Sequence, residues 1–362
     1  MIKTTMRTLP AMLLLAFSGV SAAAGFQSLE QNASGLGTAY AGSAAVADNA
    51  STVFFNPAAM TQLAGFHFSA GVVGVSERHD FRPGSVDGGE NMALPNAYLT
   101  WQLTPNFSAG IGISRPFMLD TRYPAGWLGA AEGIKSELET VNINPSVAYK
   151  LNDTVSLGLG LDYQRMDVQL TSTGNVLKVD DNALGWNAGA LFTLSPAMRV
   201  GVAYRSKIEH DLSGRLNGAA ARTDIDTPAS FTLSVWQQVS DRWEAMGDLS
   251  YTRWNAIDGF DLDNSWRLAW GAAYKYSDSA KLKFGVAYDR SPVSDSKRGV
   301  IMPDNDRLWL SLGGQWKFGR ASVVDVGYAY RYQRDAKVAD GAAVGKYDSA
   351  AHVVGVQYSV GF

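Results

Sequence analysis

The sequence of 362 residues contains no cysteine, which excludes disulfide bridges and thiol chemistry. Charged residues make up only 18% of the chain, and the formal net charge is −3. No run of basic residues occurs. This composition argues against a nucleic-acid partner.

Long apolar stretches are also missing beyond the first residues. No later segment has the roughly 20 continuous apolar residues that a membrane helix needs. Residues 1–23 are typical of a secretory signal, with Lys3 and Arg7 before an apolar core and small residues at Ser21-Ala22-Ala23. That core is too short to anchor the chain. A soluble periplasmic protein and an outer-membrane barrel both fit these features.

Motifs for catalysis and metal binding are absent from the sequence. It has no GxSxG, HExxH or paired-Cys motif, no metal cluster and no phosphate loop. His79 or His210 could serve an outer-membrane hydrolase, but the sequence places no Ser or Asp pair beside either. We therefore predict a protein that is not an enzyme and has no cofactor or metal, with a hydrolase as the outside alternative.

The chain is rich in glycine and aromatic residues, with 37 Gly, 10 Trp, 15 Tyr and 15 Phe. From residue 66 onward, apolar residues alternate with small or polar ones at period 2, which is the strand signal. Strand follows strand for almost 300 residues, whereas helices usually interrupt a soluble sandwich. We predict an all-β, antiparallel transmembrane barrel with an even number of strands. The fourteen expected strands are 66–80, 91–103, 106–116, 138–150, 154–170, 184–194, 198–211, 228–239, 242–254, 265–276, 280–290, 306–318, 321–334 and 350–362.

Short connections alternate with long ones. The short ones, such as Leu151-Asn152-Asp153, are expected on the periplasmic side, where barrel turns are tight. Phe362 ends a strand of alternating apolar residues, which predicts a C-terminal signal for the barrel assembly machinery. The expected extracellular loops are 117–137, 212–227, 255–264, 291–305 and 335–349, with a shorter connection at 171–184.

Residues 25–65 do not alternate, and 19 of these 41 residues are Ala, Gly or Ser. Small side chains let backbone pack closely in a confined space, and glycine allows tight turns. We predict three parts: a signal peptide over 1–23, a plug over 24–65 inside the lumen, and a barrel over 66–362. The alternative for the second part is a loosely ordered N-terminal arm.

Several short segments occur together, in order, along the whole mature chain. They are Ala24-Gly25-Phe26-Gln27, Ser34-Gly35-Leu36-Gly37, Tyr40-Ala41-Gly42, Ala47-Asp48, Asn56-Pro57-Ala58, 119–124, 135–138, 142–146, 227–230, 265–267 and 303–307. In this order the chain resembles the FadL/TodX (OMPP1) family of outer-membrane transporters for fatty acids and other hydrophobic compounds.

The resemblance implies a fourteen-stranded barrel, and a monomer, with an N-terminal hatch inside. It implies capture of a hydrophobic ligand by extracellular loops, hatch rearrangement and lateral release into membrane lipid. Long-chain fatty acids are the first expectation for the substrate. Aromatic or alkane hydrocarbons on the same scaffold are the alternative, and a general diffusion porin is a further one.

The hatch residues are expected to control passage. Pro57 would fix a turn, and the Asn56 side chain would hold the hatch to the wall by hydrogen bonds. The structural alternative is a simple turn into the first strand. The expected hatch and gating residues are Asn56, Pro57, Ala58, Gly35, Gly37 and Asp48.

Two sets of residues are candidates for ligand binding. A carboxylate ligand needs a basic partner in a dry pocket. The alternation of inward and outward positions along each strand places Arg205, Arg267 and Arg307 on inward faces. Apolar residues near 117–134 could form an outer groove, or could be buried by the loop itself. The apolar candidates are Phe117, Met118, Leu119, Tyr123, Trp127 and Leu128.

The third strand departs from the family pattern. Many members carry Gly near the kink of this strand, and Met118 stands at the corresponding position here. We therefore expect Gly110, Gly112 or Pro116 to supply the kink in the wall.

Overall fold

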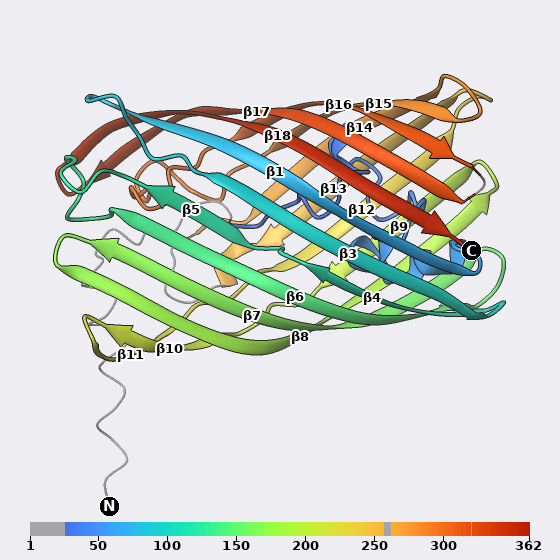
Figure 1. The fold of residues 1–362 in the computed structure, drawn as a ribbon, viewed down its shortest axis with the longest axis horizontal. Helices are drawn as coiled ribbons and strands as arrows, with labels where there is room; N and C mark the ends of the chain where they lie inside the picture. The colour runs from blue at the N-terminus through green and yellow to red at the C-terminus, as the bar shows by residue number, and fades with distance from the viewer. Residues whose placement is uncertain (1–25, 257–261, 320) are drawn as a thin grey trace, which may run out of the picture.

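The computed structural model describes residues 26–256, 262–319 and 321–362 (Figure 1). The expected signal over 1–23 lies outside these residues, as does part of the expected loop 255–264. The described strands form one antiparallel sheet that closes into a barrel where β1 pairs with β18.

Eleven positions around the barrel are filled by one continuous strand each. They are β1 (Phe66–Arg82), β3 (Asn91–Thr104), β6 (Lys135–Lys150), β7 (Val155–Ser172), β8 (Asn175–Ser195), β13 (Trp243–Arg253), β14 (Ser265–Lys275), β15 (Ala280–Asp289), β16 (Arg307–Phe318), β17 (Ser322–Asp340) and β18 (Ala343–Gly361).

Three further positions hold interrupted strands. These are β4 (Phe107–Ser114) with β5 (Met118–Arg122), β9 (Met198–Arg205) with β10 (Asp211–Leu216), and β11 (Ala219–Asp224) with β12 (Ala229–Gln238). The two-residue strand β2 (Val86–Asp87) pairs with the end of β1. The barrel therefore has fourteen strands, as the alternation predicts.

The alternation separates the two faces of the wall. On β18, Val354, Val356 and Tyr358 are exposed, whereas Val353 and Gln357 are buried inside the barrel. Burial of apolar side chains in the membrane and of polar ones in the lumen explains why one sequence pattern can satisfy both faces. Among the described residues, no helix has the length and apolar character needed to cross a membrane.

Several strands run longer than expected at one end. The prediction of loops at 212–227 and 335–349 is wrong, because β10 and β11 form a hairpin and only two residues separate β17 from β18. Likewise, the connection at 171–184 shrinks to a turn between β7 and β8. Past the apolar belt the pattern inverts: buried apolar residues such as Val338 and Tyr347 alternate with exposed polar ones such as Lys337 and Lys346. These segments therefore lack the apolar outer face by which the membrane strands are recognised.

The barrel has two distinct ends. The turn end carries the short connections and the C-terminus, where the Phe362 N–H donates to the Phe66 carbonyl over 2.8 Å. The loop end carries the hairpin tips and the longer segments, including residues 123–134 and 290–306 (Figure 1).

Residues 26–65, the N-terminal segment, lie inside the turn-end half of the barrel (Figure 1). The segment contains η1 (Leu36–Thr38), α2 (Thr52–Phe55) and η2 (Pro57–Gln62). Its first helical turn packs on β14 to β17, and η2 packs on β6 to β8 across the lumen. The segment therefore spans the interior from one wall to the other.

Glycine on the wall permits this close packing. A Cβ atom at Gly201 would lie 1.9 Å from the Ala44 carbonyl oxygen, and one at Gly189 would lie 1.9 Å from Asn56 Oδ1. Both distances are far below van der Waals contact, so only glycine lets the segment seat here.

Candidate functional site

The wall is broken between β4 and β5, at residues 115–117. Strand β3 pairs with β4 only from Ala97 toward the turn end, and β5 pairs with β6 but not with β3 along its length. An isolated bridge between Gly89 and Thr121 joins the two sides beyond the break. Strands β3 and β5 are therefore separated at this part of the wall.

The start of the N-terminal segment hydrogen-bonds to this break. The Ser28 N–H donates to the Pro116 carbonyl over 2.8 Å, and the Met118 N–H donates to the Phe26 carbonyl over 2.6 Å. Gln31 completes the pairing, since its side chain donates to the Arg115 carbonyl over 2.8 Å and accepts from the Arg115 N–H over 3.0 Å. The segment thus satisfies backbone groups that a neighbouring strand would otherwise pair.

The three residues expected to bend this strand occupy different places. Pro116 lies in the break itself, whereas Gly110 and Gly112 lie within the regular ladder of β4. A Cβ at Gly110 would come within 2.6 Å of Met60 Sδ, so this glycine makes room for the N-terminal segment. Met118 begins β5, directly after the break.

Three small cavities adjoin the first residues of the segment. The loop cavity, of about 60 Å³, lies next to Met118 and Leu119. The arginine cavity, of about 100 Å³, shares lining residues with both of the others, such as Asp304 with the loop cavity. The wall cavity, of about 70 Å³, reaches Pro116 and Phe117. Gln27 lines all three, so the segment forms the partition between them.

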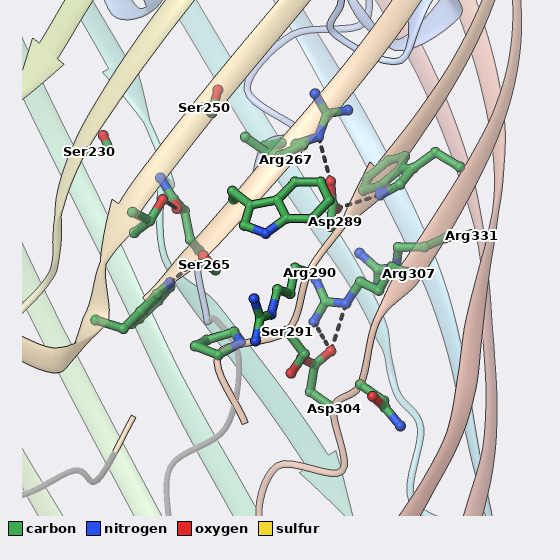
Figure 2. A pocket seen from close by; sticks show the side chains of 18 of the residues that line it. Ser230, Ser250, Ser265, Arg267, Asp289, Arg290, Ser291, Asp304, Arg307 and Arg331 are labelled. Atoms are coloured by element: carbon green, nitrogen blue, oxygen red, sulfur yellow. Dashed lines mark hydrogen bonds and ion pairs between the residues drawn. The ribbon is translucent and has the colours of Figure 1, made fainter. Parts of the chain in front are cut away.

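The arginine cavity is lined by paired charges (Figure 2). Arg267 Nε lies 2.7 Å from Asp289 Oδ1 across the β14–β15 pair. Arg307 Nε donates to Asp304 Oδ1 over 2.7 Å. Trp309 lies between Arg267 and Arg331, whose guanidinium carbons are 5.8 and 5.5 Å from its ring centre.

Arg331 links the N-terminal segment to the wall. Its Nη1 donates to Glu30 Oε1 over 3.2 Å, and its Nη2 contacts the carboxylate of Glu77 on β1. Glu30 is 2% exposed, and its other carboxylate oxygen accepts from the Ser28 hydroxyl over 2.7 Å. Both Glu30 and Arg331 line the arginine and loop cavities.

Burial dominates the environment of the Asp304 carboxyl group. Burial raises the pKa of Asp304, even though the adjacent Arg307 guanidinium acts in the opposite direction. A carboxylate that is hard to ionise beside an arginine indicates that desolvation outweighs the pairing at this position.

The three arginines expected from parity all point into the barrel. Arg267 and Arg307 line the arginine cavity, and Arg205 lines the wall cavity beside Arg267. Arg205 pairs with the fully buried Asp162 and donates to the Phe54 carbonyl over 2.9 Å. Each therefore has an acidic partner on the wall or in the loop.

Sequence reasoning missed Arg331 and Glu30. The parity rule that selected Arg267 and Arg307 also places Arg331 on an inward face. Glu30 carried a weaker signal, as a charged residue within a stretch of small ones. Their pairing joins residues 301 positions apart and has no counterpart in local sequence.

The apolar candidates separate into three groups by exposure. Phe117 is buried against Phe26, with ring centres 5.6 Å apart, and Tyr123 stacks on Trp127 at 4.2 Å. Only Leu128 among the six is exposed, at 56%. Met118 and Leu119 are half-buried and line the loop cavity.

The Asn56 side chain joins the N-terminal segment to the wall. Its Nδ2 donates to the Ala44 carbonyl over 2.7 Å and to the Ala190 carbonyl of β8 over 3.1 Å. Its Oδ1 accepts from the Ala58 N–H over 3.1 Å, which caps the turn that Pro57 begins. Asn56 is completely buried.

The other expected hatch residues lie elsewhere in the segment. A Cβ at Gly37 would come within 2.9 Å of the Gly313 backbone, and one at Gly35 within 2.7 Å of the Tyr40 ring. Asp48 is exposed and accepts a 2.7 Å hydrogen bond from Asn49.

Of the two histidines considered for hydrolysis, His79 lines the loop cavity and His210 is fully buried. His79 shares a 2.8 Å hydrogen bond with Ser349, its cross-strand neighbour on β18, and lies 3.3 Å from Glu77. Ser349 is only 1% exposed, so its hydroxyl faces no substrate space. His210 is fully buried and contacts Asp181 and Gln164.

Comparison with known proteins connects this geometry to a family. Residues 14–362 match the family model described as outer membrane protein transport protein (OMPP1/FadL/TodX). A long-chain fatty acid transport protein of Escherichia coli O6:H1 is 29% identical, with 90% of each chain covered.

Two solved structures have the same fold. A FadL homologue of Pseudomonas aeruginosa superposes with a TM-score of 0.85 at 22% identity, covering 94% of this chain and 100% of the other. The Ralstonia pickettii toluene transporter TbuX superposes with a TM-score of 0.71 at 16% identity, covering 91% and 98%.

Proposed function

The chain belongs to the OMPP1/FadL/TodX family, and from that premise we propose that it takes up long-chain fatty acids. It is a β-barrel protein of the bacterial outer membrane and a transporter of hydrophobic compounds rather than an enzyme. The turn end is then periplasmic and the loop end extracellular.

The cavities give the proposed route its direction. A ligand captured among the loops would enter the loop cavity beside Met118 and Leu119. It would pass the arginine cavity and reach the wall cavity, whose lining includes Pro116 and Phe117 at the break. Because Gln27 separates the three cavities, the route becomes continuous only when the N-terminal segment moves.

The hydrogen bonds at the break support lateral release. Withdrawal of residues 26–31 would free backbone groups of Arg115, Pro116 and Met118 at the point where β3 and β5 are already unpaired. An apolar chain could then leave sideways into membrane lipid without crossing the polar interior of the N-terminal segment. Asn56 would hold the remainder of the segment on β8 during this movement.

The buried arginines carry the assignment to fatty acids. Arg267 and Arg331 are 6% and 8% exposed, and both line the arginine cavity. A carboxylate head group would gain charge-assisted hydrogen bonds there, whereas a neutral hydrocarbon would gain none. The alternative of an aromatic or alkane hydrocarbon has support from the fold shared with the toluene transporter TbuX of Ralstonia pickettii.

A general diffusion porin remains the second alternative. It needs an open polar lumen, whereas residues 26–65 fill the turn-end half of this barrel. The filled lumen supports a gated transporter over an open pore.

Uptake of labelled oleate and of labelled toluene tests the proposal, in cells that lack their own transporter and carry this protein. We expect oleate uptake that falls with Asn56→Ala and with Pro57→Ala, and that is unchanged by Asn106→Ala in an exposed turn. Toluene uptake without oleate uptake would overturn the assignment to fatty acids. Free passage of small polar solutes without either substrate would favour a porin.

A further inference from the structure

The largely buried arginines of the arginine cavity are outnumbered by the carboxylates that contact them. Three buried or largely buried guanidiniums, those of Arg267, Arg307 and Arg331, contact four carboxylates. The carboxylates belong to Asp289, Asp304 and Glu30 on this lining, and to Glu77, which lines the loop cavity. A fourth cation on the cavity lining, Arg290, is exposed to solvent.

A fatty-acid carboxylate would add a fifth negative charge to this cluster. Removing a carboxylate from water costs several kcal/mol unless a cation compensates it, and each buried guanidinium here is already paired. A ligand carboxylate can therefore pair with one of these three guanidiniums only if it displaces a resident carboxylate.

The four resident carboxylates differ in what holds them. Asp289 lies on β15 and Glu77 on β1, both within continuous ladders of the wall. Asp304 also accepts a 2.9 Å hydrogen bond from Ser291, which ties it to the loop before β16. Glu30 alone of the four belongs to the N-terminal segment, at the partition between the cavities.

We propose that Glu30 is an internal substitute for the ligand's carboxylate, and that exchange of the two on Arg331 releases the N-terminal segment. This inference rests on the proposed transport of fatty acids. It makes Glu30 and Arg331 determinants of specificity, because a ligand without a carboxylate cannot make the exchange.

The position of Glu30 connects the exchange to the opening of the wall. Ser28, which donates its hydroxyl to Glu30, uses its backbone N–H to pair with Pro116 at the break. Gln31, the next residue after Glu30, pairs with Arg115. Displacement of Glu30 therefore also moves Ser28 and Gln31, the residues before and after it whose hydrogen bonds close the wall.

Ligand binding to the purified protein in detergent tests the charge argument. Oleate is compared with oleyl alcohol, which has the same chain and no charge, by calorimetric titration. Glu30→Gln keeps the size of the side chain and leaves Arg331 paired with Glu77. We expect it to bind oleate at least about tenfold more tightly and oleyl alcohol within about twofold of the unmodified protein.

Two further variants separate the role of Glu30 from that of charge alone. Glu77→Gln also removes a carboxylate from Arg331, so it should bind oleate more tightly. Glu244→Gln serves as the control, since Glu244 pairs with Lys281 in a different cavity, among the residues of the N-terminal segment. It should bind oleate as the unmodified protein does.

Release of the segment is measured with a single cysteine, Leu29→Cys, which the cysteine-free chain allows. Oleate should accelerate its reaction with a maleimide, and oleyl alcohol should not. With Glu30→Gln the reaction should be fast without ligand. With Glu77→Gln, oleate can bind without displacing Glu30, so the reaction should stay slow.

Two results would overturn the exchange while leaving fatty-acid transport intact. One is oleate binding that Glu30→Gln does not strengthen. The other is equal acceleration of labelling by oleate and oleyl alcohol. Failure of the unmodified protein and all variants to bind oleate would instead overturn the proposed function, and the exchange with it.

Discussion

The two halves of the barrel interior are built from the same strands but have opposite properties. In the turn-end half, wall glycines let the N-terminal segment lie directly on the backbone. In the loop-end half, large and charged side chains stand on the same inward faces and leave cavities between them. On four neighbouring strands the inward face changes from glycine to a large or charged residue within four positions. The pairs are Gly271 and Arg267, Gly285 and Asp289, Gly313 and Trp309, and Gly327 and Arg331.

Four residues of a strand span roughly 13 Å, so the interior changes character within a short distance. The same strands can therefore both hold the segment that closes the lumen and line the cavities for a ligand. A period of two fixes which residues face the lumen, and the size of those residues decides whether that level is filled by the segment or left open to a ligand.

The largest effect should come from filling the glycine level. In Gly201→Val, the new side chain would meet the Ala44 backbone, which cannot move aside as a flexible side chain would. The cost should exceed the about 1–3 kcal/mol typical of overpacking, because backbone must shift. We expect the N-terminal segment to be expelled and the barrel to conduct ions as a wide pore in planar bilayers.

Gly247→Val is the matched control for that variant. Gly247 lies on β13 with its nearest neighbouring atom 4.0 Å from an added Cβ, so no displacement is expected. Equal conductance from the two variants would contradict the close fit of the segment to the wall.

A covalent lock across the partition should have the next largest effect. Gln27 and Phe117 face each other in an isolated antiparallel bridge, which is a favourable arrangement for a disulfide. In the double variant Gln27→Cys and Phe117→Cys, oxidation should abolish oleate uptake, and a reductant should restore it. The reduced double variant controls for loss of the Phe117 ring, and unchanged uptake after verified oxidation would exclude movement of this residue.

Loss of the Asn56 side chain should be smaller, because the segment keeps its other contacts. Asn56→Ala leaves the Ala44 and Ala190 carbonyls without this donor, at about 1–3 kcal/mol for each buried group left unpaired. We expect a lower unfolding temperature, measured by the heat-dependent mobility of the folded barrel on gels. Asn106→Ala, at an exposed turn, should leave that temperature unchanged.

The smallest effect on uptake is expected from substitutions of two leucines at the loop end, Leu119 and Leu128. Leu119→Asn places an amide in the lining of the loop cavity and should lower oleate uptake a few-fold. Leu128→Asn changes an exposed residue and should leave both uptake and stability nearly unchanged, within about 0.5 kcal/mol. Equal losses would show that the ligand first contacts the outer surface of the loop.

The strands could be predicted from the sequence because apolar alternation is local. The parity of Arg205, Arg267 and Arg307 followed from the same pattern. The tips of β8, β17 and β18 were not predicted, because beyond the membrane the apolar face turns inward. Val179 and Val338 are buried in the barrel there, and the residues between such apolar positions are mostly polar.

The site could be predicted only in part. A chain segment rich in small residues points to close packing, and its Asn-Pro step predicts a turn. The pairing of Glu30 with Arg331, and that of Gln31 with Arg115, depends on which strands become neighbours when the barrel closes. Such contacts are fixed by tertiary structure and leave no trace in local periodicity.

The seam between β1 and β18 has a consequence for assembly. It pairs His67 with Gly361 and Arg82 with Lys346, so it joins the first strand to the last. Contacts with such large sequence separation form late, because the entropy of closing a loop of that length opposes them. Closure of this seam therefore completes the wall, and the same step encloses the N-terminal segment that precedes β1.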